Sequence, residues 1–213
     1  MGLSVAIPKG RLGNQAIALF KAIGIGENID EKSRKLIFED KKREIKFMLL
    51  KNSDVITYVE NGIADIGISG MDMIMEKGGD IYELYKMNIG SCKMSIAGIK
   101  GKKIFADDTV LRVATKFPET AIRYFADKGQ KVKIIRLNGS IELAPILGLS
   151  DVIVDLVETG NTLRANGLEI LDDMYNINAM VISNKISYKF KRNEINEIIE
   201  LIRREDERVD KYN

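Results

Sequence analysis

The chain has 213 residues, of which 45% are hydrophobic and 30% are charged, and its 33 basic and 31 acidic residues leave a net charge of +2. This is the composition of an ordinary globular protein, and the near-balance of charge argues against a bulk nucleic-acid binder, which carries a strong basic excess. The chain contains no histidine and one cysteine, which excludes Ser-His-Asp and Cys-His catalysis and zinc held by histidines or by a thiolate cage.

These absences also bound the metal chemistry and the compartment. Any metal ion must bind oxygen ligands, which favours Mg²⁺ held partly by substrate phosphates. The single cysteine, Cys92, cannot form an internal disulfide, which suits a reducing cytoplasm, and we interpret it as a small core residue. The N-terminal segment lacks the apolar region of a secretory signal, and no run reaches about 18 apolar residues, so we expect no membrane span.

The first half of the chain alternates predicted strands with predicted helices. Short apolar runs closed by glycine or proline indicate buried strands, and apolar residues spaced three or four apart indicate helices. The pattern predicts a strand at 3–7, a helix stopped by Gly24, strands within 31–49, a helix around 55–59 capped by Ser53 or Asp54, a strand at 64–69, and a helix from Asp72 through Met75.

The alternation starts again near residue 91. Pro118 suits the first turn of a helix, and the isoleucines near the C-terminus lie in register on one helix face. The pattern predicts strands at 104–106, 111–114, 132–137, 152–154 and 179–182, and helices at 118–128, at 141–147 after a capping Ser140, at 160–166, and around Ile195, Ile198, Ile199 and Ile202.

Together these elements predict an α/β architecture with mostly parallel sheets. The last predicted strand and helix do not fit the pattern of the second half, and we assign them to the first lobe. We therefore expect two lobes, one of residues 1–90 plus 178–213 and one of residues 91–177, with the chain crossing twice.

The most informative segment is Asp151–Leu168, with the sequence DVIVDLVETGNTLRANGL. An apolar strand runs into Asp155, and a polar loop and a predicted helix follow. Backbone N–H groups at a helix N-terminus bind phosphate, and glycine lets the backbone approach closely. The loop residues that we expect to bind substrate are Glu158, Thr159, Gly160, Asn161 and Thr162.

Asp155 is the main catalytic candidate of this segment. It ends a strand at the sheet edge where α/β proteins bind ligands, so its carboxylate suits ribose hydroxyls or a Mg²⁺–pyrophosphate. The chain contains neither GxxxxGK[ST] nor GxGxxG. The order of an acid and then Thr-Gly-x-Thr resembles the phosphoribosyl pyrophosphate loop of phosphoribosyltransferases in general. The alternative is a plain strand-to-helix turn with a capping threonine.

Three further motifs carry candidate residues. After the first strand, Lys9 and Arg11 flank Gly10 and suit the charge of a triphosphate or pyrophosphate, although a solvated turn would look the same. Lys116 follows a strand and suits a phosphate, or it is a surface charge. In the segment 138–145, Glu142 is either a second carboxylate near the ribose or metal, or a residue favoured at the start of a helix. Its neighbours Gly139 and Ser140 are candidate substrate contacts.

The motifs IPKGRL, ADIGISGMD, VATKFPETAIRYF and NGSIELAPILGLSDVIVDLVETGNTLRANGL, in this order, closely resemble the ATP phosphoribosyltransferase family over nearly the whole chain. The resemblance implies a two-lobed fold like that of type II periplasmic binding proteins, with the active site in the cleft between the lobes. It implies attack by N1 of the ATP adenine on ribose C1 of phosphoribosyl pyrophosphate, with loss of pyrophosphate and help from Mg²⁺, as the first step of histidine biosynthesis.

By this resemblance, the loop from Asp155 to Thr162 holds the ribose and the 5-phosphate, while Lys9, Arg11 and Lys51 line the charged floor of the cleft. Asp155 and Glu142 suit a cationic ribose, and the cations suit the leaving group. The family often has an arginine-rich stretch and Asp-Ile-Pro before the Tyr58 helix, whereas here Lys51 stands where arginine is common and the proline is missing.

The chain stops without the C-terminal histidine-sensing domain of long-form members, so it resembles the short-form catalytic subunit. Short forms work with a separate regulatory subunit that resembles histidyl-tRNA synthetase. We therefore expect a homodimer within a hetero-oligomer, with ATP and phosphoribosyl pyrophosphate as substrates and no nucleic-acid or membrane partner. The isolated chain is expected to be weakly active or inactive, and insensitive to histidine.

Three other functions fit parts of the pattern. A non-catalytic two-lobed solute-binding module would share the fold. A phosphoribosyltransferase for another base usually has two adjacent acids before its Thr-Gly loop, whereas here Leu156 follows Asp155. A purely structural subunit of a complex would keep the activity of that complex intact when Asp155 is replaced.

Overall fold

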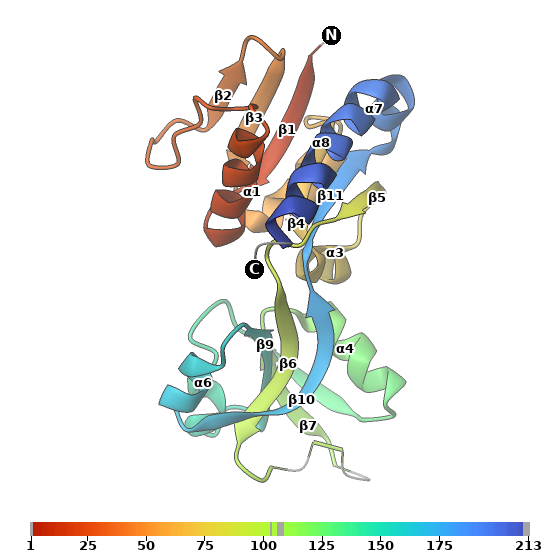
Figure 1. The fold of residues 1–213 in the computed structure, drawn as a ribbon. Helices are drawn as coiled ribbons and strands as arrows, with labels where there is room; N and C mark the ends of the chain where they lie inside the picture. The colour runs from red at the N-terminus through yellow and green to blue at the C-terminus, as the bar shows by residue number, and fades with distance from the viewer. Residues whose placement is uncertain (1, 103, 106–108, 211–213) are drawn as a thin grey trace. The chain divides into compact units, whose positions relative to one another are not determined.

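The computed structural model describes residues 2–102, 104–105 and 109–210, with the backbone alone for residues 209 and 210. The chain folds into two compact units, each with its own sheet (Figure 1). Unit 1 comprises Met1–Ile74, Gly78–Gly90 and Asn178–Asn213, and unit 2 comprises Met75–Lys77 and Ser91–Ile177. In the part of the chain that is described, no helix is long and apolar enough to cross a membrane.

The sheet of unit 1 has six strands in the order β2-β3-β1-β4-β11-β5. Their bounds are β1 (Leu3–Pro8), β2 (Ile37–Asp40), β3 (Ile45–Leu50), β4 (Ile66–Gly70), β5 (Ile81–Lys86) and β11 (Ala179–Asn184). The central strand β1 runs parallel to β3 and β4, whereas β2, β5 and β11 pair antiparallel with their neighbours. The carboxyl ends of β1, β3 and β4 therefore meet at one edge of this sheet.

Helices cover both faces of this sheet (Figure 1). Because side chains alternate along a strand, Val5 and Ile7 of β1 pack in one core while Ala6 between them packs in another. The first core takes the apolar faces of α1 (Arg11–Ala22) and α8 (Arg192–Asp210), and the second takes α2 (Val55–Glu60) and α3 (Met71–Lys77). The remaining helices of this unit are the short η1 (Asn52–Asp54) and α7 (Lys185–Phe190).

The sheet of unit 2 has five strands in the order β10-β6-β9-β7-β8. Their bounds are β6 (Cys92–Ile99), β7 (Leu111–Thr115), β8 (Val132–Arg136), β9 (Val152–Val157) and β10 (Leu168–Ile177). Strand β7 runs parallel to both β8 and β9, while β6 is antiparallel to β9 and β10. The helices are α4 (Pro118–Asp127), α5 (Leu143–Ile146) and α6 (Asn161–Ala165), and the last two pack with Ala114 and Ile153 in one core.

The predicted α/β class is confirmed, but the prediction of mostly parallel sheets was wrong. Of the nine strand pairings among the described residues, four are parallel and five are antiparallel. The antiparallel pairings come from β2, β5, β6, β10 and β11, which lie toward the sheet edges. Strands β5, β6 and β10 and helix α7 were absent from the sequence prediction.

Several local predictions also need correction. Ser140 does not cap the helix after it; it has a positive φ of 48°, and Glu142 occupies the N-cap position. Asp72 lies in the first turn of α3 behind the N-cap Gly70. Asp54 stands at the N-cap of α2, but its side chain makes no capping hydrogen bond.

Two smaller predictions were also wrong. Ile104 and Phe105 form a bend instead of the strand predicted at 104–106, and Ala106 lies outside the described residues. Cys92 is partly exposed, so it is not a core residue.

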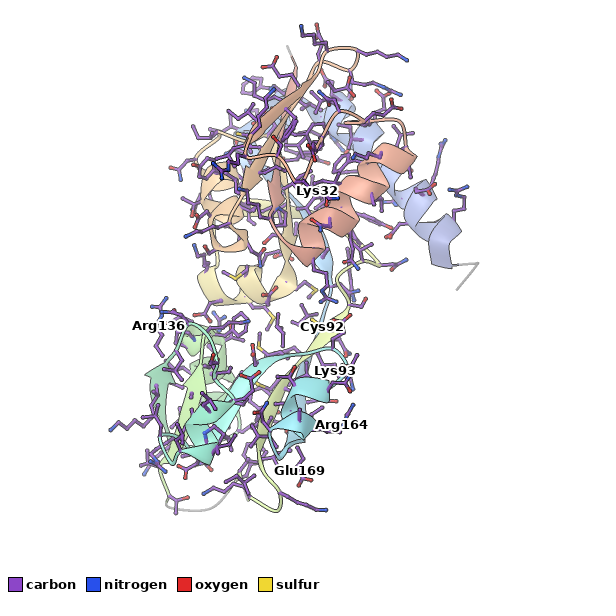
Figure 2. The ribbon with its side chains drawn as sticks, turned by 90° about the vertical axis from the view of Figure 1, so that its left-hand side faces the viewer. Lys32, Cys92, Lys93, Arg136, Arg164 and Glu169 are labelled. Atoms are coloured by element: carbon purple, nitrogen blue, oxygen red, sulfur yellow. The ribbon has the colours of Figure 1, made fainter. Side chains whose placement is uncertain are left out.

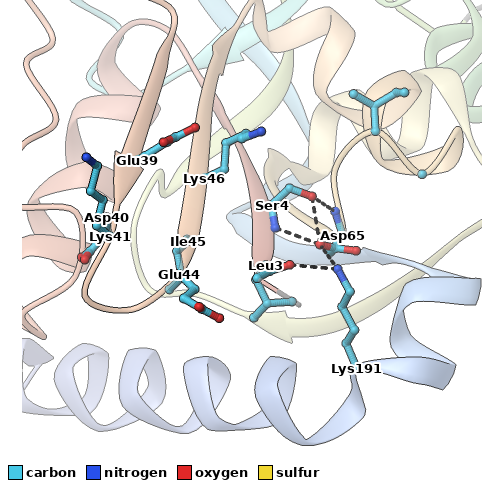
Figure 3. Close-up of a pocket in the computed structure, with 13 residues that line it drawn as sticks. Leu3, Ser4, Glu39, Asp40, Lys41, Glu44, Ile45, Lys46, Asp65 and Lys191 are labelled. Carbon is cyan, nitrogen blue, oxygen red and sulfur yellow. Dashed lines mark hydrogen bonds and ion pairs between the residues drawn. The ribbon is translucent and has the colours of Figure 1, made fainter.

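Unit 1 also contains a hollow of about 540 Å³, lined in part by a buried ion pair (Figure 3). The Asp65 carboxylate accepts hydrogen bonds from the backbone and hydroxyl of Ser4 and from the ammonium of Lys191, at 2.8, 2.9 and 2.8 Å. The ammonium also donates to the carbonyl of Gly2 at 3.0 Å. These groups satisfy one another and join β1, the start of β4 and the C-terminal helices. None of the predicted site residues lines this hollow.

Candidate active site

A second hollow, of about 260 Å³, lies at the carboxyl end of β9 in unit 2. It is lined by Glu142 and by every residue from Asp155 to Leu163. Seven of the fourteen predicted site residues line it: Glu142, Asp155, Glu158, Thr159, Gly160, Asn161 and Thr162. Strand β9 continues to Val157, so Asp155 lies inside the strand and not at its end as the sequence suggested.

Asp155, which lines this hollow, forms an ion pair with Lys116. Strands β7 and β9 are parallel with Thr115 opposite Val154, which places the next residues of both strands side by side. The Lys116 ammonium lies 3.1 Å from Oδ1 of Asp155 and 5.1 Å from the centroid of the Phe117 ring. Oδ1 itself is buried and accepts no hydrogen bond from the described residues, so its contact with the ammonium is an ion pair alone. The Asp155 side chain as a whole is 22% exposed and lines the hollow.

The loop after β9 turns on Gly160, which has a φ of +70° in the left-handed region that glycine tolerates best. Gly160 is the N-cap of α6, and the Thr159 hydroxyl accepts the Asn161 N–H at 3.4 Å. The helix has only five residues, so its macrodipole contributes less than the sequence suggested. What remains for an anion is the set of first-turn N–H groups, which lack intrahelical partners, and the hydroxyls of Thr159 and Thr162.

Arg164 braces this loop from the last turn of α6, and the sequence analysis did not single it out (Figure 2). Its guanidinium donates to the carbonyl of Thr159 at 2.9 Å and to Oδ1 of Asn161 at 2.6 Å. A Cβ added at Gly160 would lie 3.0 Å from the same guanidinium, so the arginine packs directly across the turn. The spacing of three residues between Asn161 and Arg164 on a helix was the available signal.

We expect Arg164→Gln to weaken binding of a phosphorylated ligand at this loop about 3- to 10-fold, because the loop loses a two-point brace while its own donors stay in place. Isothermal titration with phosphoribosyl pyrophosphate measures the change. Both hydrogen bonds come from one guanidinium nitrogen, and Arg164→Lys keeps the charge but places its donor on a shorter side chain, so it should recover only part of the affinity. Equal affinity in all three proteins would show that the brace has no effect on the loop.

The other predicted residues of unit 2 lie beside the hollow in different ways. Lys116 reaches it through its pair with Asp155. Gly139 and Ser140 follow β8 and are exposed, and neither lines the hollow. The backbone N–H of Leu137, just before them, donates to the carbonyl of Thr115 at 3.0 Å, which anchors this segment to the end of β7.

The four remaining candidates, Lys9, Gly10, Arg11 and Lys51, belong to unit 1. Lys9 follows β1 and Lys51 follows β3, which are parallel and in register at Pro8 and Leu50. The Lys9 N–H donates to the carbonyl of Leu50 at 2.7 Å, so the two lysines emerge side by side at the carboxyl edge of this sheet. All four residues are exposed.

The turn that carries Lys9 and Arg11 is held tightly by the helix that follows. A Cβ added at Gly13 would lie 1.6 Å from the carbonyl oxygen of Pro8, so only glycine allows α1 to pack this closely on the end of β1. The first turn of α1 contains no acidic residue, and Arg11 is its first residue. This edge of unit 1 is therefore cationic and attracts anions.

The oxygen donors around the 260 Å³ hollow fit a Mg²⁺ that arrives with a phosphorylated substrate. Among the described residues, no group of three His, Cys, Asp or Glu side chains is placed to hold a metal ion. Asp155 has a buried oxygen without a hydrogen bond, and Glu142 and Glu158 line the same hollow. Such a site suits an ion that takes one or two carboxylates and completes its shell with phosphate and water.

The carboxylate of unit 2 with the most strongly perturbed pKa lies away from this hollow. Hydrogen bonds from Arg112 hold the pKa of Asp151 well below its usual range, although burial opposes this, and Lys102 adds to the effect. Asp151 precedes β9, whereas the hollow lies at the other end of that strand. We therefore assign the Asp151 cluster to the structure of the sheet and not to chemistry.

The family model and the relatives found by comparison with known proteins all point to the same family. The HisG model, described as ATP phosphoribosyltransferase, matches residues 51–204. An ATP phosphoribosyltransferase of Clostridioides difficile (strain 630) is 55% identical over 199 residues, which cover 93% of this chain and 96% of that protein. One from Clostridium novyi (strain NT) is 49% identical over 207 residues, covering 95% and 97%.

Solved structures agree with this. The chain is similar to the ATP phosphoribosyl transferase (HisG:HisZ) complex from Thermotoga maritima, with a TM-score of 0.83 and 39% identity over 97% of this chain and 99% of that one. It also shares a fold with the periplasmic aliphatic sulphonate binding protein SsuA of Escherichia coli, with a TM-score of 0.64 and 14% identity over 96% of this chain and 72% of that one. The second likeness concerns the fold alone.

Proposed function

The chain belongs to the ATP phosphoribosyltransferase family, and we propose that it transfers the phosphoribosyl group of phosphoribosyl pyrophosphate to N1 of the ATP adenine. The reaction gives N1-(5-phosphoribosyl)-ATP and pyrophosphate and is the first step of histidine biosynthesis. The observation that carries the proposal is the hollow in unit 2, where Asp155 and the loop Glu158–Thr162 line one cavity. An acid for a ribose thus lies beside a loop of donors for its phosphate.

The loop is the proposed binding site for the 5-phosphate of phosphoribosyl pyrophosphate. Backbone N–H groups around Gly160 and the hydroxyls of Thr159 and Thr162 donate to its oxygens. Asn161 is held by Arg164, which keeps the turn in one conformation. Gly139 and Ser140 border the site from the segment after β8. A phosphate fixed in this way orients the ribose ring, with C1 presented to the incoming adenine.

Asp155 and Glu142 are the proposed stabilisers of the ribose as positive charge develops on it. In the reaction a bond forms between adenine N1 and ribose C1, and the bond from C1 to the pyrophosphate oxygen breaks with its electron pair leaving on pyrophosphate. Carboxylates placed near C1 favour the cationic transition state more than the neutral ground state. Lys116 holds Asp155 until substrate arrives and then serves as a phosphate contact. No histidine exists in the chain to act as a general base.

The cations of unit 1 are the proposed ligands of the departing pyrophosphate and of the ATP triphosphate. Lys9 and Lys51 emerge together at one sheet edge, and Arg11 adds a planar guanidinium suited to bidentate phosphate contacts. ATP phosphoribosyltransferases use a metal ion, and we propose that it is Mg²⁺, which neutralises pyrophosphate charge and contacts Asp155.

We also propose that the chain is a cytoplasmic catalytic subunit and that it works, as a homodimer, with a separate regulatory subunit. The complex from Thermotoga maritima pairs HisG with HisZ, and this chain covers 99% of the chain that it matches in that structure. A regulatory subunit resembling histidyl-tRNA synthetase would then supply the response to histidine. The isolated chain is expected to turn over weakly and to ignore histidine.

The test mixes the purified chain with the regulatory subunit of its organism, Mg²⁺, ATP and phosphoribosyl pyrophosphate, and follows phosphoribosyl-ATP absorbance together with pyrophosphate release. We expect product from the mixture and little from the chain alone, with histidine inhibiting only the mixture. Full activity and strong histidine inhibition of the chain alone would overturn the proposed division of labour. Ligand binding without any product would favour the non-catalytic solute-binding module.

A further inference from the structure

Thr115 connects the three parallel strands β7, β8 and β9, which lead to the candidate residues of unit 2. It is the last residue of β7 and is completely buried. Its hydroxyl donates to the carbonyl of Val154 at 2.7 Å, in the residue before Asp155. The same hydroxyl accepts the N–H of Phe117 at 2.9 Å, which fixes the turn that carries Lys116.

The backbone of Thr115 makes a third connection. Its carbonyl accepts the N–H of Leu137 at 3.0 Å, at the start of the segment that leads to Gly139, Ser140 and Glu142. One residue thus connects the carboxyl ends of β7 and β8 with the middle of β9, and each of these strands leads into a predicted site segment. The side-chain hydroxyl uses its one donor hydrogen and one of its two acceptor lone pairs in this junction, and the residue is completely buried, so we assign the hydroxyl to the junction and not to substrate contact.

We propose that Thr115 is a positioning residue for the reaction, acting through the Asp155–Lys116 pair; this inference rests on the proposed function. The junction holds β7 and β9 in register, so the backbone positions of Asp155 and Lys116 stay fixed when substrate replaces their 3.1 Å contact. Without the hydroxyl, the Val154 carbonyl and the Phe117 N–H lose these hydrogen bonds, and β9 and the turn after β7 are free to shift against each other. Displacements of about 1 Å in catalytic groups lower rates by about 10²-fold.

The test is Thr115→Val, which preserves the β-branched shape and removes only the hydroxyl chemistry. In the full complex we expect kcat per folded molecule to fall about 10- to 100-fold. Thr115→Ser should restore most of the activity, since it keeps the hydroxyl. Thr120→Val is the matched control: Thr120 is also buried, and its hydroxyl bonds to Glu76 at 3.0 Å without contacting the site. We expect this control to retain activity within about twofold.

A double-mutant cycle separates positioning from a general loss of stability. If Thr115 acts through the pair, Thr115→Val should cost much less in a Lys116→Ala background than in the wild type. Equal losses in both backgrounds, or a Thr115→Val enzyme with wild-type kcat per folded molecule, would overturn the inference. If the wild-type complex formed no product, the proposed function itself would be contradicted. The wild-type assay, measured first, distinguishes these failures.

Discussion

Asp155→Ala is expected to lower kcat/KM of the assembled enzyme by at least about 10²-fold while the chain stays folded. The carboxylate lies in the hollow beside the phosphate loop, and its side chain is 22% exposed. Removing it takes away a negative charge at the place where the ribose becomes positive, an electrostatic contribution that commonly amounts to about 10²–10³ in rate. Steady-state kinetics with varied phosphoribosyl pyrophosphate measure the loss.

Asp155→Asn distinguishes charge from shape in the same site. The amide has nearly the same volume but no negative charge, so we expect it to be almost as inactive as the alanine variant. Asp127→Ala is the matched control, because it removes an exposed aspartate at the end of α4, away from the hollow. An active Asp155→Ala complex would contradict the proposed role and would favour a purely structural subunit.

Lys191→Met is expected to destabilise unit 1 by about 3 kcal/mol, which corresponds to removing one partner of a buried ion pair. The Asp65 side chain is 7% exposed and Lys191 is 20% exposed, so water replaces the lost ammonium poorly. The ammonium also satisfies the carbonyl of Gly2. The shift in the urea midpoint, followed by circular dichroism at pH 7, gives the change in the free energy of unfolding.

The matched control is Lys189→Met, which removes an exposed ammonium from α7, two residues before Lys191, and should change the free energy of unfolding by less than about 0.5 kcal/mol. The double variant Asp65→Asn with Lys191→Met should recover part of the loss, because no unpaired charge remains buried. An equal effect of the two lysine variants would show that the pair adds nothing to stability.

The same pair makes this stability depend on pH. Burial works against the charged form of Asp65, but hydrogen bonds from Lys191, Ser187 and Ser4 outweigh it and hold the pKa of this carboxyl below its ordinary value of 3.8. The folded chain therefore keeps the carboxylate ionised at a pH where the unfolded chain has protonated it. The stabilisation is complete above pH 3.8 and disappears as the pH falls through the folded-state pKa. The difference between wild type and Lys191→Met should narrow over this range.

Elements with strong local patterns were predictable from the sequence. Strand β1, helix α4 behind Pro118 and the apolar face of α8 all follow from the spacing of neighbouring residues. Strands β5 and β10 were not predicted because they mix exposed and half-buried residues, so no clean alternation marks them. Strand direction was also missed, since whether a strand pairs parallel or antiparallel depends on neighbours that lie far away in the chain.

The candidate site also has a part that the sequence predicted and a part that it did not. The segment from Asp155 to Thr162 was identified because its acid, glycine and threonines are consecutive, and a local turn alone brings them into one hollow. The hydrogen bonds that hold the surrounding strands join residues that lie far apart in the sequence. Thr115 meets Val154 across 39 positions, and Lys191 meets Asp65 across 126.

The sequence by itself therefore determined the family resemblance, the class of fold and the loop that carries the candidate chemistry, because each depends on residues close together in the chain. Only the tertiary structure decided which buried hydroxyl connects the strands, which arginine braces the loop and which lysine neutralises Asp65. A hydrogen bond needs its partners within about 3 Å and at the right angle, and for Thr115 and Lys191 that proximity exists only after the sheets have formed.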